Sequence, residues 1–308
     1  LYSLKALHHL NLVNIFFSKL EHQKIEFLGM TLANRLGTAA GLDKNGDFID
    51  CIGAIGFGFV EVGTITPKAQ VGNTKPRVFR IFEEEAIINQ LGFNNKGVDY
   101  LVERLKKRTF KGAVGVNIGA NKTSNGQKRI DDYIECFNKV QNHADYITVN
   151  ISSPNTPGLR DLHSSNNLKI LIESLDKAIK SSRYKKPIFL KVSPDENNES
   201  VNEIIQIVND SSFTGLIVSN TSIDKTLLKN NSYHDYEGGL SGKPIMDKST
   251  QLLNRIHKNN LSMPLIGVGG VLSKKDFQNK INSGAQLVQL YTGFVVKGPK
   301  IVSDILKD

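Results

Sequence analysis

The chain is poor in cysteine and proline and has no long apolar run. Its two cysteines, Cys51 and Cys136, lie in apolar surroundings without a partner at a metal-ligand spacing. They therefore predict buried structural thiols in a reducing compartment, not a disulfide framework or a metal site. Nine prolines and 26 glycines in 308 residues exclude a collagen-like or low-complexity chain. The longest apolar runs are a handful of residues, far short of the ~18 that a membrane-spanning helix needs.

Acidic residues are fewer than basic residues. Against 39 lysines and arginines stand 30 aspartates and glutamates, so the net charge is +9, and the basic residues are scattered along the chain. This balance suits an acidic ligand or an anionic surface. No nucleic-acid-binding module and no basic stripe with interleaved aromatics is present, so nucleic acid is not an expected partner. No secretory signal pattern follows Leu1.

Short apolar runs alternate with amphipathic stretches along the sequence. The runs predict eight strands, at Leu36–Leu42, Phe57–Gly63, Ala113–Ile118, Tyr146–Ile151, Ile188–Val192, Gly215–Ser219, Pro264–Val268 and Leu287–Tyr291. Between them, a three-four periodicity predicts helices that include Asp132–Val140, Leu168–Ile179, Val201–Val208 and Lys274–Ile281. Eight alternations of strand and helix predict a closed parallel (β/α)8 TIM barrel over residues 26–308.

Two segments depart from this repeat. Residues 64–95 are too long for an ordinary connection, and their apolar content predicts an ordered insertion. Residues 1–25 predict a small N-terminal helical extension, because their apolar residues fall on one helical stripe: Leu4, Leu7, Leu10, Val13, Phe17 and Leu20.

Polar and glycine-rich groups follow the predicted strands, at the face where barrel enzymes place their active sites. The segments Gly267–Gly270 and Tyr291–Gly293 follow the last two strands, where barrels bind phosphate through backbone amides. A phosphorylated ligand is therefore expected. A dinucleotide-binding fingerprint is disfavoured, because Glu61 and Leu272 stand where its third glycine would be.

Two lysines and several asparagines are predicted to contact a ligand at this face. Lys44 and Lys191 each follow or end a strand among small or apolar neighbours, and they predict contact with a substrate carboxylate or a cofactor ring. Lys191 by itself fits a Schiff-base lysine equally well. A side-chain amide offers a hydrogen-bond donor and an acceptor together, which suits a planar heterocycle such as a pyrimidine. Asparagines occur at strand ends or in the insertion at Asn89, Asn94, Asn117, Asn150, Asn155 and Asn220. The proline-stiffened segment at residues 151–158 predicts a lid that carries a catalytic serine.

The chain resembles the quinone-dependent (class 2) dihydroorotate dehydrogenases from about Leu28 to Gly298. The resemblance is carried by the strings TAAGLDKNG, VEVGTITPKAQVGNTKPRVFR, INQLGFNNKG, VNISSPNTPGLR, GGLSGKP, LIGVGG and VQLYTGFVVKGP. It implies a barrel that binds FMN and oxidises (S)-dihydroorotate to orotate, the fourth step of pyrimidine (UMP) biosynthesis. A membrane quinone would accept the electrons.

The resemblance also implies roles for individual residues. Ser153 matches the catalytic base, and because the cytosolic class has cysteine there, the serine favours the quinone class. The FMN contacts match Ala40 to Lys44, Thr64, Asn117, Asn150, Lys191, Ser219, Gly242, Gly270, Tyr291 and Thr292. The family has threonine at the position of Ser219, so a hydroxyl is retained. The orotate contacts match Lys44, which reaches the carboxylate, and Asn89, Gln90, Leu91, Gly92, Phe93, Asn150, Asn155, Asn220 and Thr221.

The pattern of the N-terminal stripe fits two uses: packing on the barrel as ordinary core, or forming an apolar mouth for a quinone tail at a membrane surface. The resemblance favours the mouth, because the quinone class is distinguished by a helical N-terminal extension. The histidine, arginine and tyrosine of the family's tunnel match His8, Arg80 and Tyr291, and His9 competes with His8 for the first role. The resemblance implies a peripheral protein on the cytoplasmic side of a bacterial inner membrane, with the mitochondrial inner membrane as the alternative.

Three other functions stay open from the residues. A tRNA dihydrouridine synthase would suit the basic charge, but it would carry a cysteine on the catalytic loop and a C-terminal RNA-binding domain. An aldolase would form a Schiff base at Lys191. A non-enzymatic binding protein would keep the fold but would lose residues of the pocket.

Overall fold

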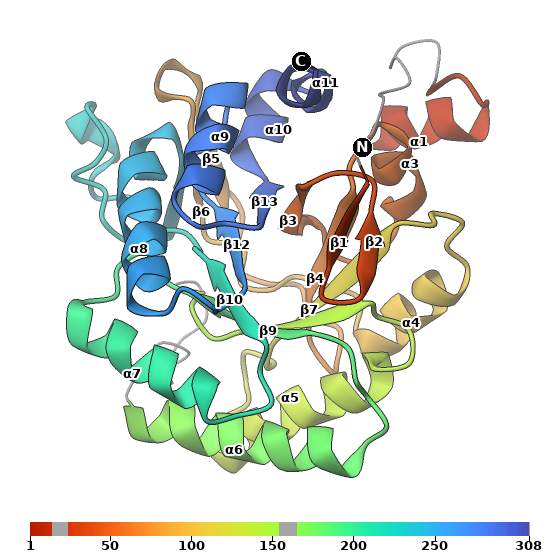
Figure 1. Ribbon diagram of the computed structural model, residues 1–308. Helices are drawn as coiled ribbons and strands as arrows, with labels where there is room; N and C mark the ends of the chain where they lie inside the picture. Colours follow the sequence, from red (N-terminus) through yellow and green to blue (C-terminus); the bar gives the residue numbers. More distant parts are fainter. Residues whose placement is uncertain (14–23, 154–164, 308) are drawn as a thin grey trace.

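Eight parallel strands close into a barrel in the computed structural model, which describes residues 1–13, 24–153 and 165–307 (Figure 1). Each barrel strand pairs with the next one around the barrel, and the last pairs with the first. The predicted TIM barrel is confirmed, with every predicted strand within two residues of an observed one. The strands are β3 (Leu36–Asp43), β4 (Phe59–Ile65), β7 (Ala113–Ile118), β8 (Tyr146–Asn150), β9 (Ile188–Val192), β10 (Gly215–Val218), β12 (Leu265–Val268) and β13 (Leu287–Leu290).

Helices cover the outside of the barrel. Most barrel strands are buried along their whole length, because one face points into the barrel and the other lies under the helices. The four predicted helices lie within α5 (Gln127–Val140), α6 (Ser165–Ser181), α7 (Asn198–Asn209) and α9 (Lys274–Asn282). The remaining helices of the described chain outside its first 13 residues are α3 (Ile49–Ala54), α4 (Val98–Lys106), α8 (Met246–Asn259), α10 (Thr292–Lys297) and α11 (Ile301–Leu306).

Local capping explains where two of these helices begin. The Asn197 side chain accepts a hydrogen bond from the Ser200 N–H ahead of α7. The Ser273 side chain accepts one from the Asp276 N–H ahead of α9. Each bond satisfies a first-turn amide that has no partner within the helix.

A short hairpin closes the amino-terminal end of the barrel. It consists of β1 (Ile25–Phe27) and β2 (Met30–Leu32), which pair antiparallel. Phe27 and Leu32 pack with the aromatic residues inside the barrel, and the Phe27 ring stacks on Phe189 with 6.2 Å between the centroids. These three-residue strands were not predicted, because they are too short to show a periodicity.

A second sheet lies beside the carboxyl ends of the barrel strands. β5 (Val78–Ile81) and β6 (Ala86–Asn89) come from the insertion at residues 64–95, which is ordered as predicted. β11 (Gly239–Gly242) comes from the segment after β10 and pairs antiparallel with β6, so that Asn89 faces Gly239. This third strand was not predicted. The sheet joins two distant connections into one wall above the barrel.

The N-terminal helix is shorter than predicted. α1 (Tyr2–His9) ends at His9, and Asn11 follows in the left-handed region with φ of 55°. Leu4 is buried, but Leu10 is 65% exposed, so the stripe predicted from Leu4 to Leu20 does not continue on one buried face. Phe17 and Leu20 of that stripe lie outside the described residues. Within residues 1–13, 24–153 and 165–307, no helix has both the length and the apolar character needed to cross a membrane.

Candidate functional site

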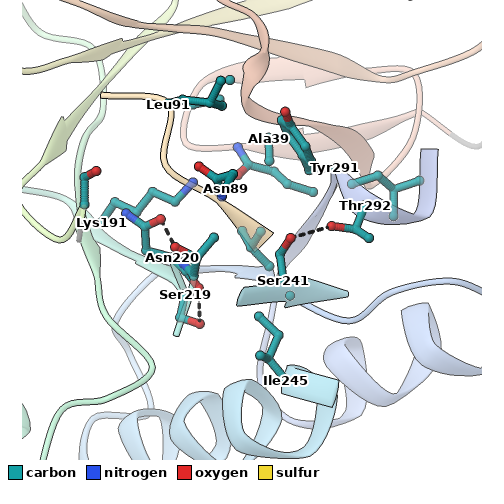
Figure 2. A pocket seen from close by; sticks show the side chains of 18 of the residues that line it. Ala39, Asn89, Leu91, Lys191, Ser219, Asn220, Ser241, Ile245, Tyr291 and Thr292 are labelled. Carbon is teal, nitrogen blue, oxygen red and sulfur yellow. Dashed lines mark hydrogen bonds between the residues drawn. The ribbon is translucent and has the colours of Figure 1, made fainter. Parts of the chain in front are cut away.

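The carboxyl ends of the barrel strands and the second sheet form a cavity that is open to solvent on one side. Most residues predicted from the sequence line it, although they come from all parts of the chain. In Figure 2, Lys191 and Asn220 lie on one side of this cavity and Tyr291 and Thr292 on the other. The predicted residues in the lining are Ala40, Gly41, Lys44, Thr64, Asn89, Leu91, Gly92, Phe93, Asn150, Ser153, Lys191, Ser219, Asn220, Thr221, Gly242, Gly270, Tyr291 and Thr292.

Four residues assigned through the family resemblance lie outside the lining, as does Asn94, and one further residue cannot be placed. The Gln90 amide donates to the Pro76 carbonyl oxygen at 3.3 Å. The Asp43 carboxylate accepts three backbone N–H bonds from the loop that carries Lys44, so it shapes that loop. Leu42 and Asn117 also lie outside the lining. Asn155 falls outside the described residues.

Hydrogen-bonded side chains run from the cavity into the barrel. The Asn220 amide donates to Asn150 Oδ1 at 3.2 Å, and the Asn150 amide donates to Thr64 Oγ1 at 3.0 Å. The Thr64 hydroxyl donates to Asn117 Oδ1 at 2.6 Å, and the Asn117 amide donates to Glu61 Oε1 at 2.9 Å. Asn117 is thus buried beneath the lining and fixes the side chain of Thr64 above it. The chain of bonds holds the amides of the cavity in fixed orientations.

Glu61 lies at the inner end of this chain and was missed as a site residue. It is fully buried, and besides Asn117 it accepts hydrogen bonds from Tyr146, Thr148 and Gln289 at 3.0, 3.1 and 2.7 Å. Four donors satisfy a carboxylate that burial would otherwise penalise. The sequence did contain a signal for Glu61, because it is a single acidic residue within the apolar run of a predicted strand.

Two lysines face the cavity. Burial lowers the pKa of Lys191 on β9, and the nearby Glu61 carboxylate opposes that shift. Burial, followed by the positive charge of Arg77, lowers the pKa of Lys44 to about 8. Both lysines therefore sit where a negatively charged group would favour their protonated forms.

Glycines shape the end of the cavity that lies next to the carboxyl ends of β12 and β13. Gly270 has φ of +78°, and a Cβ there would lie 2.4 Å from Met246 Cβ. Gly242 has φ of +99°, and a Cβ there would lie 2.2 Å from the Glu85 carbonyl oxygen and 2.9 Å from Thr292 Cγ2. Only glycine fits such positions without a shift of the backbone. Both glycines line the end of the cavity where the sequence predicted a phosphate site.

Several lining residues were not assigned from the sequence. Ser241 on β11 accepts a hydrogen bond from the Thr292 hydroxyl at 2.8 Å, which links the second sheet to α10. Ser241 comes from the strand that sequence periodicity did not reveal. The other lining residues without a prior assignment are Ala39, Ile245, Val271, Gln289 and Leu290. The lining residues Val268, Gly269 and Gly293 belong to the glycine-rich segments for which the sequence predicted a phosphate site.

Two adjacent serines follow β8 and have different surroundings. Ser152 is fully buried, accepts a hydrogen bond from the Asn220 amide at 2.9 Å and donates one to the Lys191 carbonyl oxygen at 2.8 Å. Ser153 lines the cavity. The geometry therefore leaves Ser153 as the serine of this pair that can meet a ligand.

The three residues predicted for a quinone tunnel do not share one cavity. Tyr291 lines the large cavity, and Arg80 on β5 lies close enough to lower the Tyr291 pKa against the raising effect of burial. His8 and His9 line a separate, smaller cavity between α1, α3 and α4. Arg80 and Tyr291 are thus neighbours, whereas both histidines lie elsewhere.

Comparisons with known proteins agree with the fold and identify a family. The family model described as "Dihydroorotate dehydrogenase" matches residues 22–308. A Saccharophagus degradans protein named "Dihydroorotate dehydrogenase (quinone)" is 45% identical over 306 residues, which cover 98% of this chain and 90% of that protein. A Photobacterium profundum protein of the same name is 47% identical over 288 residues, with coverages of 92% and 85%. The crystal structure of DHODH in complex with ferulenol from Eimeria tenella superposes with a TM-score of 0.89 at 31% identity, covering 99% of this chain and 89% of that chain.

Proposed function

The chain belongs to the dihydroorotate dehydrogenase family, and we propose that its cavity binds FMN together with dihydroorotate. It is an oxidoreductase of the quinone-dependent kind, which oxidises dihydroorotate to orotate in pyrimidine biosynthesis. The observation that carries the proposal is the convergence of 18 assigned residues on one cavity.

The two ends of the cavity fit the two parts of FMN. Gly242, Gly269 and Gly270 line one end of the cavity and have positive φ, so their main chain would lie against the phosphate group. Lys191, Asn150 and Thr64 would meet the polar edge of the ring. When bound, FMN would supply the two-electron redox chemistry between the substrate and the quinone. Lys191 would place a positive charge beside the ring.

The substrate would lie on the same side as Lys44 and the asparagines. Lys44 would bind the carboxylate of dihydroorotate, because a charge-assisted contact is the strongest that the lining offers to an anion. Asn89, Asn150 and Asn220 present donors and acceptors together, which matches the alternating C=O and N–H groups of the pyrimidine edge. Asn155 is assigned here only through the family resemblance.

Ser153 would act as the base. Oxidation of dihydroorotate removes a proton from C5 and a hydride from C6, and Ser153 would take the C5 proton. A serine hydroxyl is a weak base at neutral pH, so the site must exclude water and stabilise the developing charge. Ser153 lies in the same cavity lining as Lys44 and Lys191, which supply that charge.

The membrane side would lie at the N-terminal helix. The cavity beside α1 carries several cationic side chains, among them Lys5, Arg104, Lys107 and Arg108, with Asp47 and Asp50 as the acidic members. A surface of this composition supports peripheral binding to anionic lipid. The location that the family resemblance implies is the cytoplasmic side of a bacterial inner membrane, with the mitochondrial inner membrane as the alternative.

A visible absorption spectrum with anaerobic titration tests this function. The purified protein should show flavin bands that bleach on addition of dihydroorotate and return on addition of a quinone. A colourless protein that borohydride traps at Lys191 with a carbonyl substrate would instead be an aldolase. A yellow protein that dihydroorotate does not bleach would overturn the substrate but not the cofactor.

A further inference from the structure

A lysine is buried behind the glycine loop that follows β12. Lys280 on α9 is fully buried, and Gly267 lies against it, since a Cβ at Gly267 would be 3.3 Å from Lys280 Cβ. Its Nζ donates to Ser249 Oγ at 2.6 Å. Within the described part of the chain, Ser249 is the only hydrogen-bond partner of the Nζ, and the carboxylates of Asp276 and Asp247 act on it without forming an ion pair. An ammonium group in such surroundings is costly unless something offsets the cost.

Ser249 connects this lysine to the loop. The Ser249 hydroxyl lies 3.1 Å from the Gly269 carbonyl oxygen and 3.1 Å from the Met246 carbonyl oxygen. A hydroxyl has a single proton to donate. When Lys280 is protonated, Ser249 must accept from it, and the serine proton is then committed to one of these two carbonyl oxygens.

The Gly269 carbonyl fixes the orientation of the next amide. In a trans peptide, the C=O of Gly269 and the N–H of Gly270 point in opposite directions. A carbonyl held toward Ser249 therefore turns the Gly270 N–H toward the other side, and Gly270 lines the cavity. In the described residues, the Gly270 N–H has no hydrogen-bond partner within the protein.

We propose that Lys280 is a positioning residue for the phosphate subsite: through Ser249 it holds the Gly269–Gly270 peptide with its N–H toward a bound phosphate monoester, and its buried charge attracts that group. The proposal rests on the proposed function, since the phosphate is that of FMN. The bound phosphate would in turn offset the buried charge of Lys280.

Phosphate binding and protonation of Lys280 are then linked. Burial lowers the pKa of Lys280 to about 7, while Asp276 on its own helix and Asp247 on α8 act in the opposite direction. A phosphate monoester carries a charge of about −1.5 to −2 near pH 7 and favours the protonated lysine. FMN binding should therefore take up protons above pH 7, and its affinity should fall as the pH rises through the pKa of Lys280.

Binding of FMN and riboflavin to the apoprotein tests the role in phosphate recognition. Riboflavin has the same ring but no phosphate, so effects of Lys44 or Lys191 beside the ring act on both ligands. Lys280→Met should weaken FMN binding at least tenfold, about the effect of one lost charge-assisted contact, and leave riboflavin binding unchanged. Ser249→Ala should do the same to a smaller degree. Lys275→Met, which removes an exposed lysine from the same helix, is the matched control and should change neither affinity.

Two further measurements separate positioning from a structural role. Lys280→Met replaces a buried charge with an apolar side chain of similar length, so the melting temperature of the apoprotein should stay the same or rise. Calorimetry in buffers of different ionisation enthalpy should detect proton uptake with FMN near pH 8 in the wild type, and none with riboflavin. A lower melting temperature together with equal losses for both flavins would overturn the proposal. So would wild-type FMN binding without proton uptake.

Flavin binding by the wild-type apoprotein distinguishes a failure of the proposed function from a failure of the role given to Lys280. A wild-type apoprotein that binds neither FMN nor riboflavin would contradict the proposed function. A wild-type apoprotein that prefers FMN, with Lys280→Met showing the same preference, would contradict the role of Lys280 alone.

Discussion

The Ser152 hydroxyl donates a hydrogen bond to the Lys191 carbonyl oxygen at 2.8 Å, whereas Ser153, its neighbour in sequence, lines the cavity. One serine thus ties the end of β8 to β9, and the other is available to a ligand. The pair offers a matched test, because the same substitution at adjacent positions should have effects of different kinds.

Ser153→Ala should leave FMN bound and slow the reduction of the flavin by roughly 10²- to 10⁴-fold, the contribution of a positioned base. Ser153→Cys should retain more activity, with an optimum at lower pH, because a thiol with a pKa of about 8.5 ionises more readily than a hydroxyl. Anaerobic stopped-flow at the flavin band measures both. A loss below about tenfold for Ser153→Ala would refute the assignment of the base.

Ser152→Ala should mainly lower the stability of the fold. It leaves the Asn220 amide without one of its acceptors and should lower the free energy of unfolding by about 1 to 3 kcal/mol. Urea unfolding followed by circular dichroism measures this loss. An unchanged stability, with flavin reduction as slow as in Ser153→Ala, would show that the two serines have the opposite roles.

The affinity for orotate should depend on the protonation of Lys44. Its pKa of about 8 means that the side chain is cationic below this pH and neutral above it. Orotate binding should therefore weaken as the pH rises from 7 to 9. Lys44→Met should weaken binding by about 1.5 to 3 kcal/mol at pH 7 and remove this pH dependence. Titration of orotate against the flavin spectrum measures both, and an affinity that the variant leaves unchanged would assign Lys44 to the cofactor or the fold.

Gly270→Ala should disrupt the phosphate end of the cavity. Gly270 and Gly29 share φ of +78°, but a Cβ at Gly270 would lie 2.4 Å from Met246 Cβ, while a Cβ at Gly29 would meet nothing within 4 Å. Gly29→Ala is therefore the control for backbone strain alone, about 1 to 2 kcal/mol. Gly270→Ala should lower the free energy of unfolding by a further ~1 to 3 kcal/mol and weaken FMN binding. Equal effects of the two variants on FMN affinity would contradict the assignment.

Removal of residues 1–23 tests the route of the electrons to the quinone. This deletion ends before β1, whose Phe27 packs under the barrel and must stay. Bleaching of the flavin by dihydroorotate should remain largely intact, while turnover with a long-tailed quinone and binding to anionic liposomes should both collapse. Full-speed reduction of that quinone by the shortened chain would mean that α1 only packs against α3.

The barrel could be predicted from the sequence because its strands are buried on both faces. Each strand, such as Ile188–Val192, appears as a short apolar run whatever its neighbours are. The cavity residues could be predicted for a related reason: Lys44, Asn150 and Lys191 lie at strand ends, and the ends of parallel strands meet at one face. The motifs of the family then identified the chemistry.

Other features depend on contacts between distant segments, which local patterns do not reveal. The length of α1 was overestimated because the apolar stripe continues past His9, where the backbone turns at Asn11. β11 is a strand because Gly239–Gly242 pairs with β6, about 150 residues earlier in the chain. No local periodicity marks a four-residue strand of this composition.

The sequence by itself thus determined the barrel, the face that carries the site and the residue types that reach it. Only the tertiary structure decided which of those residues touch the cavity: it placed Asn117 beneath Thr64, turned Ser152 away and Ser153 inward, and buried Lys280 behind Gly269. The physical reason is that strand identity follows from local burial, whereas the partner of a polar side chain depends on what the fold brings within hydrogen-bond distance.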